Sequence, residues 1–129
     1  MLFKGRSINP GKAEAEALVS REPIGFYGGI DPKTGIFIEK GHELEGMSVT
    51  GKILVFPKGK GSTVGSYVIY GLATNKVGPA AIVNQETETI VATGVILAGV
   101  PCVDGIPTEK IRTGDRLRVD ADAGTVEVL

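Results

Sequence analysis

Tryptophan is absent from this sequence, and cysteine and histidine occur once each. The single cysteine, Cys102, cannot form a disulfide within the chain, which favours a reducing, cytoplasmic environment. One cysteine and one histidine, His42, are also too few ligands for a zinc ion or an iron–sulfur cluster. We therefore expect no metal site in this chain alone, and any metal chemistry would depend on a partner chain.

Long apolar runs and an excess of one charge are also missing. No apolar segment approaches the roughly 18 residues that span a bilayer, and residues 1–6 lack the apolar core of a signal peptide. The 14 basic and 15 acidic residues give a net charge of −1. This balance argues against binding to nucleic acid or to an anionic membrane, although it is compatible with a local basic pocket.

Glycine is abundant, with 19 residues among 129, against an average usage of about 7%. The length suits one domain over residues 1–129. Short Val/Ile/Leu runs between glycines predict an α/β fold that is mostly β. Residues 13–19 alternate like a strand but contain helix-favouring alanine and glutamate, and we favour a strand. We expect strands at residues 2–8, 13–19, 52–56, 79–84, 100–103, 116–120 and 125–129, helices ending near 72 and 98, and an ordered loop at 28–35.

The most informative segment is residues 58–66, Lys-Gly-Lys-Gly-Ser-Thr-Val-Gly-Ser. It follows a predicted strand and precedes a predicted helix, with Ser62 or Thr63 as the expected N-cap. Backbone N–H groups, a helix N-terminus and lysine ammonium groups at such a turn can hold an anion. The alternative is a tight turn in which the glycines are needed only for the backbone conformation and Ser62 caps the helix. The pattern leaves both interpretations open.

A nucleotide-binding P-loop does not fit this segment. That motif needs a lysine directly before the magnesium-binding hydroxyl, whereas Gly61 separates Lys60 from Ser62. Elsewhere, His42 lies in a polar turn and is expected to be exposed to solvent. Cys102 lies in an apolar run and is expected to be a buried structural thiol. The loop at 28–32 is either a neighbour of the central turn or a plain loop.

The sequence resembles the small subunit of aconitase X-type hydro-lyases along nearly its whole length. The Lys-Gly-Lys-Gly-Ser segment is the most specific part of the resemblance. Two departures occur: Thr63 stands where the family often has a second serine, and Val64 and Gly65 follow where aconitases carry an arginine. The resemblance rests on residues 22–24 (Glu-Pro-Ile), 28–32 (Gly-Gly-Ile-Asp-Pro), 51–66, 79–84 and 100–104.

The resemblance implies a swivelling β/β/α domain like the mobile fourth domain of aconitases. It also implies a large catalytic subunit that holds a [4Fe-4S] cluster, and a hydro-lyase that removes water from a hydroxy acid. A free-standing chain of this length is most similar to those that convert (R)-5-phosphomevalonate to trans-anhydromevalonate 5-phosphate in the archaeal mevalonate route. Alternatives are another hydroxy acid, such as cis-3-hydroxyproline, or a non-catalytic scaffold domain.

The resemblance also implies roles for individual residues. Ser62 corresponds to the serine that accepts the substrate proton. Because a serine hydroxyl is a poor base, its alkoxide would need several kcal/mol of stabilisation from nearby N–H groups and a lysine. Swivelling domains also occur as phosphohistidine carriers, but no histidine follows Ser62, which argues against that class. The residues expected to bind substrate beside Ser62 are Lys58, Gly59, Lys60, Gly61 and Thr63.

Overall fold

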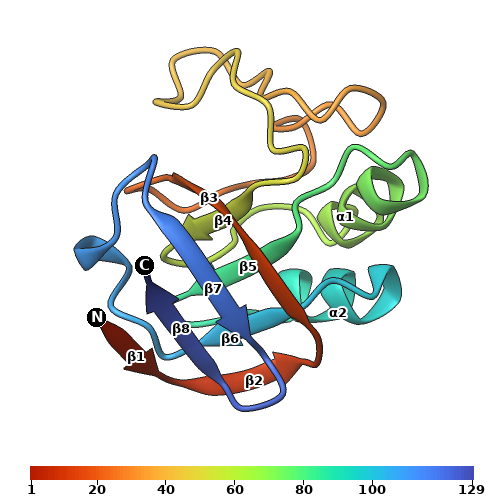
Figure 1. The fold of residues 1–129 in the computed structure, drawn as a ribbon. Helices are drawn as coiled ribbons and strands as arrows, with labels where there is room; N and C mark the ends of the chain where they lie inside the picture. The colour runs from red at the N-terminus through yellow and green to blue at the C-terminus, as the bar shows by residue number, and fades with distance from the viewer.

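The computed structural model describes all residues, 1–129, and shows one strongly curved sheet with two helices against one face (Figure 1). The elements are β1 (Leu2–Lys4), β2 (Arg6–Asn9), β3 (Lys12–Val19), β4 (Ile53–Phe56), α1 (Gly65–Thr74), β5 (Ala81–Asn84), α2 (Thr89–Ala98), β6 (Cys102–Asp104), a short 3₁₀ turn (Thr108–Lys110), β7 (Arg116–Asp120) and β8 (Thr125–Val128).

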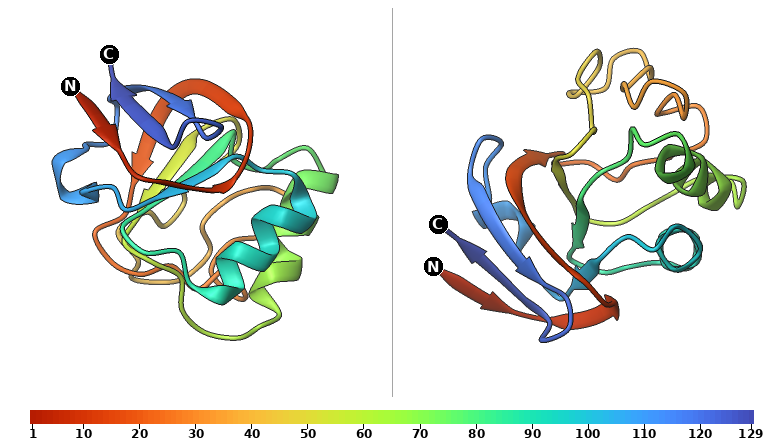
Figure 2. Two further views of the ribbon diagram at one scale, coloured as in Figure 1. Left: turned by 90° about the horizontal axis from the view of Figure 1, so that it is seen from below. Right: turned by 45° about the vertical axis from the view of Figure 1, so that its right-hand side comes forward.

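The eight-stranded sheet has the order β1-β8-β7-β3-β4-β5-β6-β2. Strands β3 to β6 run parallel to one another. Each pair is joined by a crossover: residues 20–52 connect β3 to β4, α1 connects β4 to β5, and α2 connects β5 to β6. The remaining pairings are antiparallel, including the predicted hairpin of β7 and β8. Figure 2 shows the resulting three layers, with β1, β7 and β8 on one side, the parallel strands between, and the helices on the other. The expected β/β/α architecture is confirmed.

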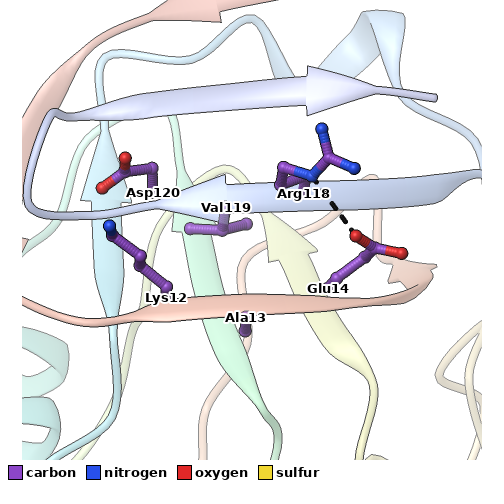
Figure 3. A pocket seen from close by; sticks show the side chains of 6 residues that line it. All are labelled: Lys12, Ala13, Glu14, Arg118, Val119 and Asp120. Carbon is purple, nitrogen blue, oxygen red and sulfur yellow. Dashed lines mark hydrogen bonds and ion pairs between the residues drawn. The ribbon is translucent and has the colours of Figure 1, made fainter.

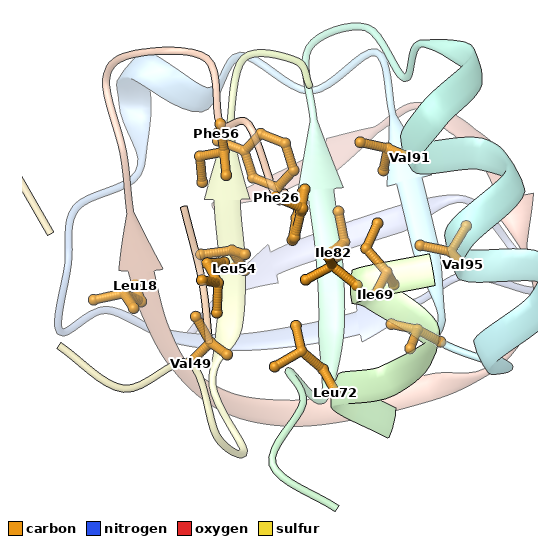
Figure 4. Close-up of a cluster of buried hydrophobic side chains, with 14 of the residues drawn as sticks. Leu18, Phe26, Val49, Leu54, Phe56, Ile69, Leu72, Ile82, Val91 and Val95 are labelled. Carbon is orange, nitrogen blue, oxygen red and sulfur yellow. The ribbon is translucent and has the colours of Figure 1, made fainter. Parts of the chain in front are cut away.

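The central strands feed two separate cores because successive side chains of a strand point to opposite faces. On β4, Leu54 and Phe56 join the cluster beneath the helices, which is drawn in Figure 4. Ile53 and Val55 join a second cluster inside the curve of the sheet. All four are fully buried. The uninterrupted apolar run that predicted a core strand therefore reflects burial on both faces.

The helix predicted to end near residue 98 exists as α2, and its internal glycine has a packing role. A Cβ added to Gly94 would lie 2.6 Å from Cδ1 of Ile69 on α1. A glycine in the middle of a helix costs about 1 kcal/mol relative to alanine. At Gly94 the missing side chain allows the two helices to approach each other closely.

Two local predictions were wrong. Residues 2–8 form two strands rather than one, because the chain leaves one side of the sheet and joins the other at Gly5. A side chain at Gly5 would overlap the carbonyl oxygen of Asp104. Helix α1 begins at Gly65 with Val64 as its N-cap and has no side-chain cap. Ser62 and Thr63 therefore lie in the turn before the helix instead of capping it.

Candidate functional site at the carboxyl ends of the parallel strands

The turn at residues 57–64 leaves the carboxyl end of β4, and the loop at 85–88 leaves the carboxyl end of the neighbouring β5. In open parallel sheets this edge is where ligands bind, because the loops and helix N-termini converge there. The topology therefore places the Lys-Gly-Lys-Gly-Ser segment at the edge of the sheet where ligands are expected.

The loop after β5 holds the base of this turn. The carbonyl of Pro57 accepts hydrogen bonds from the backbone N–H groups of Gln85 (3.0 Å) and Glu86 (3.1 Å). The Asn84 side chain, which is completely buried, donates from Nδ2 to the carbonyl oxygen of Phe56 at 3.0 Å. These three bonds fix the end of β4 before the chain enters the exposed part of the turn.

The segment after Pro23 supports the opposite side of the turn. Ile24 donates its N–H to the carbonyl of Lys58 (3.1 Å) and accepts the N–H of Lys60 (3.0 Å), so the two segments pair like parallel strands around Gly59. The side chain of Lys60 lies against Gly25, where an added Cβ would be 3.6 Å from its Cγ. The lysine stem therefore lies along a surface that has no side chain of its own.

The tip of the turn is open to solvent. Gly61, Ser62 and Thr63 are exposed, and no acceptor within the chain receives their N–H groups. Gly61 has a φ of +90°, a conformation that glycine adopts without strain. Ser62 Oγ accepts the N–H of Val64 at 3.2 Å, so one donor already points at the hydroxyl. The three free N–H groups supply donors for an anion beside it.

Lys58 and Lys60 are both exposed and take part in none of the ion pairs of the chain. An unpaired ammonium on a flexible stem can move to meet a carboxylate or phosphate. The structure thus brings together the turn residues predicted from sequence: Ser62, the two lysines, and the backbone of Gly59, Gly61 and Thr63.

Sequence reasoning missed the residues that hold the turn from outside it. Segment 24–27 contacts the turn, whereas the neighbouring residues 28–32 pack against α1, where Asn75 Nδ2 donates to the carbonyl of Pro32 at 2.8 Å. From the sequence, Asn84 is recognisable only as the end of a strand. A polar residue ending a buried parallel strand, next to the strand that leads into the turn, was the available signal.

The prediction for His42 was wrong. Its imidazole is only 6% exposed and stacks on Phe37, with ring centroids 5.1 Å apart. Its Nδ1 accepts the N–H of Leu44 at 3.0 Å. The buried apolar side chains of residues 28–50 belong to the cluster beneath the helices, and the imidazole packs at Phe37, one of its members. The polar neighbours of His42 in sequence point outward and gave no sign of this.

The prediction for Cys102 is confirmed. The thiol is fully buried on β6, and burial raises the pKa of Cys102 to about 12. A thiol that ligates a metal must be ionised to the thiolate, so this thiol is unsuited to hold a cluster.

No three His, Cys, Asp or Glu side chains gather closely enough to bind a metal ion. In addition, neither helix is long and apolar enough to cross a membrane.

A second hollow, of about 430 Å³, lies on the outer face of β3 and β7 (Figure 3). Acidic and basic side chains alternate around it, and Arg118 Nε donates to Glu14 Oε1 at 3.2 Å. These charges largely compensate one another at an exposed sheet surface. The hollow has no cluster of free N–H donors like the one at Ser62.

The amino-acid sequence matches a known protein family over nearly its whole length. The model of the aconitase X swivel domain matches residues 2–128. This chain belongs to the aconitase X swivel domain family. The phosphomevalonate dehydratase small subunit of Thermococcus kodakarensis is 57% identical over 129 residues, covering 100% of this chain and 97% of that one. The corresponding small subunit of Methanosarcina mazei is 53% identical, covering 98% of this chain and 90% of that one.

The aconitase X swivel fold also matches a solved structure. The holo-form crystal structure of Thermococcus kodakaraensis aconitase X superposes with a TM-score of 0.99 at 56% identity, covering 100% of this chain and 98% of that chain. The agreement extends over the whole chain, and it includes the turn that carries Ser62.

Proposed function

We propose that this chain is the small subunit of a phosphomevalonate dehydratase, a hydro-lyase that is active only with a large subunit. The single observation that carries the chemistry is the exposed Ser62 hydroxyl, which receives the Val64 N–H and lies among three backbone N–H groups that the chain leaves free. The names of relatives at 53–57% identity support the substrate. On this proposal the enzyme converts (R)-5-phosphomevalonate to trans-anhydromevalonate 5-phosphate.

Ser62 is the proposed proton acceptor. In the elimination, the α-carbon proton passes to Ser62 Oγ, the C–H electron pair becomes the new C=C bond, and hydroxide leaves the adjacent carbon. An unassisted serine alkoxide forms too rarely in water at neutral pH. The Val64 N–H at 3.2 Å favours the alkoxide, and so does the positive end of α1. The ammonium of Lys60 adds to this when its flexible stem brings it to Ser62.

On this proposal, the rest of the turn binds the anionic groups of the substrate. Phosphate and carboxylate oxygens are strong acceptors for the free N–H groups of Gly61 and Thr63. Lys58 and Lys60 precede these groups in the same turn and have no competing carboxylate partner within the chain. Gly59 between them is buried, and its missing Cβ leaves room for the side chains of Glu88 and Val91, which pack beneath the turn.

The family resemblance implies a [4Fe-4S] cluster, and the residues of this chain do not fit one. The only thiol is buried, with its pKa raised to about 12, and no ligand group is assembled elsewhere. We assign the cluster to the large subunit and derive no step of the reaction through it. The contribution of this chain is the base, the anion-binding turn, and a surface that closes over the substrate.

The test is Ser62→Ala in the complex reconstituted with the large subunit. Loss of a general base lowers turnover by about 10²–10⁴-fold. The matched control is Ser48→Ala, because Ser48 is also exposed and its Oγ accepts the N–H two residues later, from Thr50 at 3.1 Å. Turnover of phosphomevalonate is measured beside that of cis-3-hydroxyproline. Near-normal turnover by Ser62→Ala would rule out Ser62 as the base, and preference for hydroxyproline would rule out the substrate.

A further inference from the structure

The two helices carry no charged side chain. Helices α1 and α2 have ten residues each, Gly-Ser-Tyr-Val-Ile-Tyr-Gly-Leu-Ala-Thr and Thr-Ile-Val-Ala-Thr-Gly-Val-Ile-Leu-Ala, although 22% of the whole chain is charged. A helix on the surface of a free-standing domain normally carries charged residues on the side away from the core. An uncharged outer side is typical of a helix that another surface covers.

Large apolar and aromatic side chains occupy the outer side instead. Tyr67 is 68% exposed and Tyr70 is 45% exposed on α1, while Ile96 is 60% and Leu97 is 50% exposed on α2. Tyrosine is enriched at the centres of protein interfaces, where charged residues are depleted. Exposed apolar residues also occur elsewhere in this chain and are ordinary one at a time. On α1 and α2, however, they stand without any charged residue between them.

A groove runs along the seam between the helices. It has a volume of about 370 Å³, and no charged residue lines it. Val64 and Tyr67 border it on the α1 side, and Ile90 and Leu97 border it on the α2 side. Its lining begins at Thr63, the residue next to Ser62. The groove is therefore continuous with the proposed catalytic turn.

We propose that the seam between α1 and α2 is the surface on which the large subunit docks. This inference rests on the proposed function, which requires a large subunit to complete the site over Ser62. A partner that reaches Ser62 must also cover Thr63 and the first turns of both helices, where the groove begins. The complementary face of the large subunit is expected to be uncharged, with apolar side chains that fill the groove.

A second copy of this chain is the competing occupant, and the position of the groove argues against it. A symmetric dimer through the seam would bury Thr63 in both copies and close the approach to Ser62. Such a dimer would therefore have to dissociate before the large subunit could complete the site.

The experiment measures the dissociation constant for the purified large subunit by isothermal titration calorimetry. Leu97→Glu places a charge in the groove, and Tyr67→Glu does so at a side chain that is 68% exposed, where a folding defect is not expected. The matched control is Leu2→Glu, since Leu2 is 64% exposed on β1, away from the helices. We expect both groove variants to weaken binding at least about tenfold and the control to bind like the unmodified chain. Far-ultraviolet circular dichroism establishes that each variant is folded.

Unchanged binding by both folded groove variants would overturn the docking proposal. So would sedimentation of the unmodified chain as a dimer that Leu97→Glu converts to a monomer. The proposed function fails separately. If the groove variants weaken binding but the unmodified complex does not dehydrate phosphomevalonate, the docking surface stands and the substrate assignment does not. If the unmodified complex dehydrates phosphomevalonate but the groove variants bind the large subunit normally, the proposed function stands and the docking surface does not.

Discussion

The carboxylate of Glu88 lies directly against Gly59, so that a Cβ added to this glycine would be 2.5 Å from Glu88 Oε1. The same carboxylate caps α2, with Oε2 accepting the N–H of Ile90 (2.9 Å) and Oε1 accepting that of Val91 (2.8 Å). One side chain thus closes the N-terminus of α2 and defines the space available to the turn between the two lysines.

Gly59→Ala is expected to damage both stability and turnover. The new methyl group would displace Glu88 from its cap or push the turn away from it, at a cost of about 1–3 kcal/mol. The matched control is Gly25→Ala, whose Cβ would meet Lys60 at an ordinary 3.6 Å, so its stability should change by less than about 1 kcal/mol. Urea unfolding of the isolated chain measures the free energies. Equal stability of the two variants would contradict the packing role assigned to Gly59.

Asn84 is expected to be a positioning residue for the catalytic turn. Its amide donates to the Phe56 carbonyl, and its Oδ1 accepts from the Thr87 hydroxyl at 3.0 Å. Asn84→Ala removes the donor to the buried Phe56 carbonyl and the acceptor for the half-buried Thr87 hydroxyl. The cost is about 1–3 kcal/mol for an unsatisfied buried group. Asn84→Asp keeps the shape but removes the donor to Phe56, so it should not restore stability.

The control for Asn84 is Gln85→Ala, an exposed side chain that bonds Glu109 at 3.1 Å and should change stability by about 0.5 kcal/mol or less. Kinetics of the reconstituted complex provide the second measurement. A positioning role predicts a lower kcat with little change in KM, since the substrate-binding N–H groups lie beyond the fixed part of the turn. A full recovery of kcat in Asn84→Asp would contradict that role.

Cys102 should make the stability of the chain depend on alkaline pH. Burial raises the pKa of its thiol from 9.0 to about 12 in the folded chain. The unfolded thiol therefore ionises first, so its contribution is complete below pH 9 and is lost progressively as the pH rises from 9 to 12. At pH 10 the loss is about 1.4 kcal/mol.

The measurement is the difference in unfolding free energy between the unmodified chain and Cys102→Ala at pH 7 and pH 10. Other groups that titrate in this range cancel in the difference, which should shrink by the amount lost at Cys102. A difference that is constant with pH would show that the thiol ionises as readily in the folded chain as in the unfolded one. Alkylation of the folded chain with iodoacetamide at pH 8 should also be slow, because the thiolate is scarce and covered.

The sequence predicted the elements that local pattern determines. The apolar run at 53–56 and the strand ending at Asn84 were evident because parallel strands buried on both faces are continuously apolar. Alternation correctly favoured a strand at 13–19, where the alanines and glutamates alone favoured a helix. The turn at 58–66 was evident because few functions other than anion binding require glycines, lysines and hydroxyl side chains so close together.

What the sequence did not predict depends on contacts between distant segments. The burial of His42 depends on its stacking against Phe37 within a loop that has no periodic pattern. Ile24 pairs with the chain around Gly59, and α1 begins only at Gly65, so Ser62 lies between the paired segment and the helix. Asn84 and Glu88 reach the turn only because β4 and β5 are neighbours. None of these relationships is visible along a single stretch of chain.

The crossing at Gly5 has a consequence for how this domain meets other chains. The two outermost strands of the sheet order, β1 and β2, are consecutive in sequence and are linked by this one residue, which donates its N–H to the carbonyl of Gly124 at 2.7 Å. The edges are thus only three and four residues long, and they meet at the same point (Figure 2). Short edges of this kind offer little ladder for an added strand. Neither amyloid-like stacking nor recognition by strand addition has a suitable template here, which leaves helices and loops to provide the contacts.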